Sequence, residues 1–352
     1  MPAPVESLSS LCLVRLSALG DVVLATALVR TLQANFPRCR LTWVTTPLAA
    51  ELLRGLDGVE FVVIDKPRRP GDYLAFRRRM RGRRFDVLLA AQANFRVNLL
   101  HAFVPARRKI GFDARRARDL HTWFVSETIP RRDEHLADGF LAFAGALGVA
   151  PENYVRETVV PLAEADFAGI AGLRPAGRYL VMNPAASKPE RTWPAENYAA
   201  VADFAVSRTG WPVVLTGGGG PREKELAQAV VRCAVQPITD LTGRTTVRQL
   251  AALLARAEGL VAPDTGPVHI ADALGTPVVG LYAVARAALA GPWRDQRYCV
   301  DQYDAASRAF LGRPAAAVDW HRRVHHPGAM ALITVDEVCT KVAQLAADRE
   351  RR

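Results

Sequence analysis

Short, almost uninterrupted apolar runs alternate along the chain with longer segments whose apolar residues recur at helical spacing. Such runs are typical of strands that are buried on both faces of a parallel sheet. The longer segments are typical of helices that bury one face. Strands are expected at Leu11–Leu16 (interrupted only by Arg15), Leu41–Thr45, Val59–Ile64, Val87–Ala91, Tyr179–Met182, Trp211–Leu215, Gly259–Ala262 and Val278–Tyr282. Helices are expected at Val22–Phe36, Tyr73–Met80, Glu134–Val149, Glu196–Ser207, Glu223–Cys233, Arg248–Ala257, Val268–Leu274 and Val335–Asp348. The repeated strand–turn–helix order predicts an α/β fold with doubly wound parallel sheets.

The strand–turn–helix pattern begins again after a polar segment rich in Pro and Gly, so we expect two domains. The length of 352 residues agrees with two domains of ordinary size. We place the first domain at residues 1–172, with a short strand near Val155–Val160, and the second at residues 173–334. Residues 298–324 have no clear pattern and are expected to be irregular. A final helix in residues 335–352 is expected to pack toward the first domain.

The chain is basic, which favours an anionic partner. It has 46 Lys and Arg against 35 Asp and Glu, a formal net charge of +11. Basic residues gather in two blocks of the first half, Lys66–Arg84 and Arg107–Arg118. Such blocks are often solvated surface, but arginine also pairs well with the phosphates and carboxylates of a substrate. Nucleic acid is not expected, because there is no helix-turn-helix pattern, zinc finger or aromatic-rich RNA-binding strand.

Three features of the sequence predict a cytoplasmic protein. The five cysteines are scattered and form no CxxC pair, as expected for reduced thiols. The N-terminal apolar run Leu11–Leu16 is too short for a secretory signal. No window approaches the roughly 18 consecutive apolar residues of a membrane span.

The stretch Val261–Tyr282, VAPDTGPVHIADALGTPVVGLY, is the most informative part of the chain. It is expected to contain the end of a buried strand, a polar turn, a helix and a second strand. Thr265 and Gly266 would place a hydroxyl and free N–H groups at the helix start, where the partial positive charge favours a phosphate. Equally, Asp264 or Thr265 could simply cap the helix.

Asp21 lies in the turn between the first strand and the first helix, LSALGD. The carboxyl end of a strand in an open α/β sheet is the edge at which ligands bind. At that place Asp21 is either an acidic residue that stabilises the start of the helix or a catalytic base. The residues alone favour the helix-start role.

Six stretches of the sequence resemble glycosyltransferase family 9. They are LSALGDVVLATALVRTLQANFP near the start, AAQANFR at Ala90–Arg96, KIGFD at Lys109–Asp113, HLADGFLAFAGALGV at His135–Val149, SKPERTWP at Ser187–Pro194 and DTGPVHIADALGTPVVGLY at Asp264–Tyr282. They cover nearly the whole chain in the expected order. The family contains the ADP-heptose:lipopolysaccharide heptosyltransferases of Gram-negative bacteria.

The resemblance implies a GT-B fold, in which two Rossmann-like domains face a central cleft. The first domain would bind the acceptor and the second the ADP-sugar. The implied reaction is an inverting transfer of heptose from ADP-heptose to the lipopolysaccharide inner core, on Kdo-lipid A or on a heptosylated core. The enzyme would act at the cytoplasmic face of the inner membrane, in peripheral contact with it.

The resemblance also assigns roles to residues. Asp21 matches the catalytic carboxylate that accepts the proton of the acceptor hydroxyl, and Arg191 is the second catalytic candidate. The donor would be bound by Ser187, Lys188, Glu223, Asp264, Thr265, Gly266, Pro267 and His269. The acceptor would be bound by Gly20, Arg68, Arg69, Arg78 and Arg79.

Two departures from the family pattern bear on the donor site. The family often carries Lys two residues before the Trp-Pro pair, where this chain has Arg191, so Lys188 is an alternative phosphate partner. AVARAALAGPW replaces the more usual GPTDPARTGPYG, which leaves the donor contacts there open. The sequence has no DXD motif, so we expect a reaction without metal or cofactor. Transfer of another sugar by the same fold and nucleotide-sugar epimerisation are the alternatives.

Overall fold

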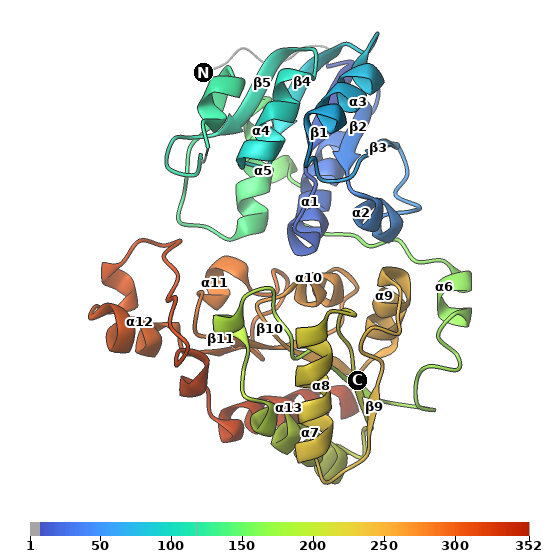
Figure 1. Cartoon of the computed structure of the whole chain (residues 1–352), viewed down its shortest axis with the longest axis vertical. Helices are drawn as coiled ribbons and strands as arrows, with labels where there is room; N and C mark the ends of the chain where they lie inside the picture. The colour runs from blue at the N-terminus through green and yellow to red at the C-terminus, as the bar shows by residue number, and fades with distance from the viewer. Residues whose placement is uncertain (1–7, 118, 352) are drawn as a thin grey trace. The chain divides into compact units, whose positions relative to one another are not determined.

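The computed structural model describes residues 8–117 and 119–351, and the chain divides into two compact domains at Pro161 and Leu162. In Figure 1 the first domain runs from blue to green and the second from green to red. Arg118, a member of the second basic block, lies outside the described residues. None of the described helices is both long and apolar enough to cross a membrane.

The first domain is one six-stranded parallel sheet with helices on both faces. The strands lie in the order β3-β2-β1-β4-β5-β6, with Leu11 of β1 opposite Leu41 of β2 and Val87 of β4. Its strands are β1 (Ser10–Val14), β2 (Arg40–Thr45), β3 (Val59–Val63), β4 (Phe85–Ala90), β5 (Ala106–Phe112) and β6 (Glu127–Ile129). Its helices are α1 (Leu19–Asn35), α2 (Pro47–Leu52), α3 (Pro70–Met80), α4 (Phe95–Ala102) and α5 (Leu136–Ala146). Helix α1 packs against α5, and α3 packs against α4.

The second domain repeats this plan. Its parallel strands lie in the order β12-β11-β10-β7-β8-β9, so the first three strands in sequence again run outward on one side and the last three on the other. Its strands are β7 (Leu180–Met182), β8 (Val213–Leu215), β9 (Ile238–Asp240), β10 (Gly259–Pro263), β11 (Val278–Tyr282) and β12 (Val300–Asp301). Its helices are α6 (Glu164–Ala168), α7 (Ala195–Thr209), α8 (Pro221–Cys233), α9 (Val247–Arg256), α10 (Gly266–Ala273), α11 (Ala287–Ala290), α12 (Tyr303–Leu311) and α13 (Val335–Glu350). Both domains are thus doubly wound, as predicted.

The domain boundary lies earlier than the residue 172 that we expected. Helix α6 is joined to the second domain by a buried ion pair, in which Arg248 Nε of α9 donates to Asp166 Oδ1 at 2.6 Å. Both side chains are less than a tenth exposed. Because of this contact between residues distant in sequence, the segment that begins at Leu162 belongs to the second domain.

The final helix also belongs to the second domain. Val338, Val342 and Leu345 of α13 are buried in the same core as Tyr198 and Val201 of α7. The expectation that this helix packs toward the first domain is therefore corrected, because its apolar face is already covered by the second.

The strand expected near Val155–Val160 is absent from the structure. The segment has no regular secondary structure and belongs to neither sheet. The N–H groups of Val155 and Val159 instead donate to the hydroxyls of Thr31 and Thr26 on α1, each at 2.9 Å. The hydroxyls of two buried threonines thus accept the hydrogen bonds that the carbonyls of a neighbouring strand would have accepted in a sheet.

One further expectation needs correction, and the structure also locates the second basic block. Residues 298–324 are not irregular throughout, because they contain β12 and the nine-residue helix α12. The second basic block begins inside a strand, since Arg107, Arg108 and Lys109 lie in β5. Arg108 Nε lies 2.7 Å from Glu127 Oε1 on the neighbouring strand β6. This ion pair joins β5 to the edge strand of the sheet.

Candidate active site

The ligand-binding edge of the first sheet lies where β1 and β4 run side by side. From β1 the chain proceeds toward β2, and from β4 toward β5, on the other side of the sheet. In doubly wound sheets, ligands bind outside the carboxyl ends of the strands at such a reversal. The segments that follow β1 and β4, residues 15–18 and 91–94, form this edge.

Asp21 lies at this edge, in the first turn of α1, and it is paired with Arg15. Its Oδ2 contacts the guanidinium of Arg15 and accepts the backbone N–H of Ala18 at 3.1 Å. The side chain of Asp21 is 27% exposed. Because both partners approach Oδ2, Oδ1 is the oxygen that remains for a substrate hydroxyl. Asp21 is therefore both a helix-start acid and an accessible carboxylate.

Arg15 is held from several sides. Its Nη1 donates to the carbonyl of Ala91 at 2.6 Å, and its guanidinium lies over the Phe140 ring, 5.2 Å from the ring centre. Its side chain is only 12% exposed. Arg15 therefore links the end of β4 to the carboxylate at the start of α1.

Gln92 closes the same edge and borders a hollow of about 370 Å³. Its Oε1 accepts the N–H groups of Leu16 and Ser17 at 2.8 and 3.3 Å. The hollow is lined by residues of these turns together with Lys66, Asn94 and Arg96. The lining also includes Asp119, so the hollow carries two cations and one carboxylate at the switch point that carries Asp21, and its cations can bind an anionic group of a ligand.

The second sheet has the equivalent edge between β7 and β10. The segment after β7, residues 183–194, contains Ser187, Lys188 and Arg191, and β10 leads into Asp264, Thr265 and α10. Asn183 fastens this edge, because its Nδ2 donates to the carbonyl and hydroxyl oxygens of Thr216 at 3.0 and 3.2 Å. The predicted donor residues thus gather at one switch point.

Thr265 is the N-cap residue of α10 but makes no capping hydrogen bond through its side chain. The capping interpretation of this turn therefore fails for Thr265, whose hydroxyl is left for a ligand. Pro267 and the buried His269 belong to the first turn of the same helix, and Gly266 begins it. A helix start with an uncommitted hydroxyl is a suitable place for a phosphate group.

Two arginines converge on Asp264 in this turn. Nη1 of Arg191 lies 3.1 Å and Nη1 of Arg323 3.2 Å from Asp264 Oδ2. Asp264 and Arg191 are 13% and 16% exposed, whereas Lys188 is an exposed residue of the same loop. Two guanidiniums on one carboxylate provide more positive charge than the carboxylate balances, beside the predicted diphosphate turn.

Glu223 lies against the glycine run that follows β8. A Cβ on Gly218 would stand 2.2 Å from Glu223 Oε2, so a larger residue there would displace the carboxylate from its present position. Arg222 Nη2 donates to Thr192 Oγ1 at 3.0 Å and thereby joins the start of α8 to the 183–194 loop. Glu223 is therefore placed at the same edge as the other donor candidates.

The histidines near the end of the chain bind protein groups. His325 Nδ1 lies 2.9 Å from Glu190 Oε1, and this hydrogen bond lowers the pKa of Glu190. His326 stacks on Phe310 with 3.8 Å between ring centres. Within residues 8–117 and 119–351, no three His, Cys, Asp or Glu side chains are grouped to hold a metal ion.

The predicted acceptor residues fall into two groups. Gly20 is buried beside Asp21 in α1, and Arg68 and Arg69 are exposed just before α3, at the carboxyl edge of the sheet. Arg78 and Arg79 lie near the other end of α3, and Arg79 donates to the carbonyl of Val63. The structure thus does not place Arg78 at the edge that carries Asp21.

Sequence reasoning missed Arg15, Gln92 and Arg323 as site residues. Arg15 had a visible signal, since it is the single charge in an otherwise apolar strand. Arg323 had none, because it comes from an irregular segment 59 residues beyond Asp264.

Comparison with known proteins identifies the family of the chain. The model of glycosyltransferase family 9 (heptosyltransferase) matches residues 73–312. The lipopolysaccharide core heptosyltransferase OpsX of Haemophilus influenzae is 30% identical over 348 residues, which are 98% of this chain and 99% of that protein. The lipopolysaccharide heptosyltransferase 3 of Escherichia coli is 25% identical and aligns over 78% of this chain and 83% of its own.

Solved structures share the fold. A glycosyltransferase of family 9 from Veillonella parvula matches with a TM-score of 0.80 and 21% identity, over 97% of this chain and 98% of its own. The E. coli heptosyltransferase WaaC with ADP matches with a TM-score of 0.68 and 20% identity, over 96% and 99%. The predicted GT-B class, with two Rossmann-like domains, is confirmed. The chain is a glycosyltransferase and belongs to glycosyltransferase family 9, the heptosyltransferase family.

Proposed function

We propose that this enzyme transfers heptose from ADP-heptose to the inner core of lipopolysaccharide, on Kdo or on a preceding heptose, with inversion at the anomeric carbon. The observation that carries the proposal is that each domain has one of the two required groups at its own switch point, a base for the acceptor in the first and a phosphate-binding turn for the donor in the second. The first presents the carboxylate of Asp21, and the second presents Thr265 beside Arg191 and Asp264. The names of the aligned relatives support the sugar and the acceptor class.

The reaction requires a base on the acceptor side. Asp21 accepts the proton of the acceptor hydroxyl as that oxygen forms its bond to the anomeric carbon. The bond between the anomeric carbon and the β-phosphate oxygen breaks on the opposite side of the sugar, so the configuration inverts. Arg15 holds the carboxylate in position.

The reaction also requires stabilisation of the leaving group. As ADP departs, negative charge grows on its β-phosphate. The N–H groups at the start of α10, the hydroxyl of Thr265 and the guanidinium of Arg191 are placed to receive that charge. The position of Arg191, which is 16% exposed and paired with Asp264, favours it over the exposed Lys188 as the phosphate partner.

The acceptor is carried by a lipid, so we place the reaction at the cytoplasmic face of the inner membrane. Lys66, Arg68, Arg69 and Arg96, near the hollow of the first domain, would meet the carboxylates and phosphates of the core.

A transfer assay tests the proposal. Purified enzyme is incubated with ADP-heptose and Kdo-lipid A or a heptosylated core, the product is identified by mass spectrometry, and its anomeric configuration is read by NMR. We expect the addition of one heptose with inversion. Tighter binding of GDP or UDP than of ADP in calorimetry would contradict the donor. Conversion of a nucleotide sugar without any acceptor would instead identify an epimerase.

A further inference from the structure

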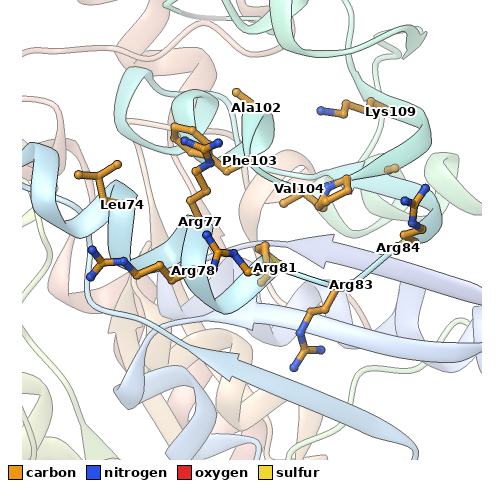
Figure 2. Close-up of a pocket in the computed structure, with 14 residues that line it drawn as sticks. Leu74, Arg77, Arg78, Arg81, Arg83, Arg84, Ala102, Phe103, Val104 and Lys109 are labelled. Atoms are coloured by element: carbon orange, nitrogen blue, oxygen red, sulfur yellow. The ribbon is translucent and has the colours of Figure 1, made fainter.

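The first domain has a second concavity at the amino end of its sheet. It is a groove of about 850 Å³ between the last turns of α3 and α4, and the segments that enter β4 and β5 close its other sides. Figure 2 shows the side chains around it, with Leu74, Arg77 and Arg78 on α3 and Phe103 just beyond α4.

The lining of this groove carries positive charge alone. It includes five arginines and Lys109, and no Asp or Glu. Arg83 is neutralised by Glu60, with 2.6 Å between Nη2 and Oε1. Among the residues that the structure describes, no carboxylate pairs with Arg77, Arg78, Arg81 or Arg84. Lys109 donates to the carbonyl of His101 at 2.8 Å, and burial lowers its pKa.

Part of the lining is apolar. Leu74 is 50% exposed on the rim, and Phe103 and Pro105 contribute further apolar surface. Arginines in the last turn of a helix stabilise the helix dipole, and this alone would account for their presence in α3. It does not account for a hollow with apolar walls beside them. Unpaired guanidiniums next to apolar surface match a ligand with an anionic head and an apolar body.

The groove is distinct from the site around Asp21. β4 begins at Phe85 beside the groove and ends at Ala90 beside the Asp21 edge. Six strand residues span roughly 20 Å. A small group bound in the groove therefore cannot also present its hydroxyl to Asp21.

We propose that this groove docks the enzyme on a bilayer by binding the headgroup of an anionic phospholipid. The guanidiniums of Arg77 and Arg81, which lie near each other in Figure 2, contact the phosphate, and Leu74 with Phe103 contacts the first methylenes of the lipid. The proposal rests on the proposed function in one respect, namely that the acceptor is carried by a membrane lipid. Single-stranded nucleic acid is a poorer match, because it needs a row of stacking rings and Phe103 is the one aromatic residue in the lining.

Vesicle cosedimentation tests the proposal with the full-length enzyme. The probes are vesicles of phosphatidylcholine alone and vesicles with about one third phosphatidylglycerol. The double variant Arg77→Gln/Arg81→Gln removes two charges from the groove. The matched control, Arg208→Gln/Arg232→Gln, removes two exposed charges from α7 and α8 of the second domain.

We expect the wild type and the control to bind the anionic vesicles equally, and the groove variant to bind them about tenfold more weakly. Leu74→Ser should also weaken binding, without changing its salt dependence. Equal losses in the control and the groove variant would overturn the proposal, because net charge would then suffice. A groove variant that loses affinity for an oligonucleotide but not for vesicles would overturn it in favour of nucleic acid.

A second readout separates this proposal from the proposed function. Transfer to a soluble, delipidated acceptor should be the same in the groove variant and in the wild type. If vesicle binding is unaffected by the groove variant while transfer is intact, the docking proposal alone fails. If the groove variant loses vesicle binding as expected but no transfer occurs with the wild type, the proposed function alone fails.

Discussion

Arg15 and Asp21 form an ion pair across the turn between β1 and α1, and the arginine is the more buried partner. Its guanidinium is also fixed by the carbonyl of Ala91 and by the Phe140 ring. The carboxylate therefore takes its orientation from a side chain that is itself held by two other elements. In the proposed mechanism Arg15 positions the base without touching the substrate.

Replacement of Arg15 should lower turnover without weakening donor binding. In Arg15→Gln we expect kcat to fall at least about tenfold, because the base loses its orientation, whereas Asp21→Asn should lose about 10²–10⁴-fold. Calorimetry with ADP should give the wild-type affinity for both variants. Arg15→Lys should recover part of the activity. If Arg15→Gln still slows the residual turnover of Asp21→Asn by the same factor, the two residues act independently and the positioning role is wrong.

The two arginines on Asp264 should both contribute to donor affinity. A charge-assisted hydrogen bond contributes about 1.5–3 kcal/mol, so Arg191→Ala and Arg323→Ala should each weaken ADP binding roughly 10- to 100-fold. Isothermal titration measures this directly. Arg322→Ala, which alters an exposed neighbour, is the control and should bind ADP normally. A larger loss in Lys188→Ala than in Arg191→Ala would transfer the phosphate role to the lysine.

The buried pair of Arg248 and Asp166 should matter for stability rather than activity. Asp166→Ala removes the carboxylate that balances the buried guanidinium of Arg248, which costs about 3–5 kcal/mol. Arg308→Ala breaks a pair whose members are 62% and 52% exposed, and should cost less than about 1 kcal/mol. Urea denaturation compares the two variants. Similar small losses in both would show that α6 is not fastened to the second domain in this way.

Acid should destabilise the first domain through His121. This side chain is fully buried, its Nε2 accepts the N–H of Phe112 at 3.1 Å, and burial lowers its pKa to about 4. Below pH 6.5 the unfolded chain binds the proton more readily than the native protein, so stability is lost as the pH falls from about 6.5 toward 4. The loss between pH 7 and pH 5 should be about 2 kcal/mol. Denaturation curves at the two pH values measure it.

His121→Gln provides the control for this dependence. Its side chain cannot take up a proton, so the difference in stability between pH 7 and pH 5 should shrink. The buried His101, whose pKa is also lowered by burial, contributes with the same sign and would leave a residual slope. An unchanged slope in His121→Gln would remove His121 as a source of the acid sensitivity.

The order of strands and helices could be read from the sequence because it depends on local patterns. The apolar run of β1 and the periodic face of α1 placed Asp21 at the carboxyl edge of a sheet, and the Pro263–Pro267 turn was placed in the same way. The motifs then indicated the family. The segment at Val155–Val160 has the composition of a strand, but the hydroxyls of Thr26 and Thr31 bind its N–H groups, and no local pattern reveals that.

The sequence by itself therefore determined the two α/β domains and the edge on which the candidate residues lie. The tertiary structure alone decided which side chains meet there, namely Arg15 with Asp21, and Arg191 and Arg323 with Asp264. It also placed Arg78 in the groove at the other end of the first sheet. The reason is physical. Strand and helix periodicity follow from the burial of neighbouring residues, whereas an ion pair or a groove requires the positions of elements that are far apart in the chain.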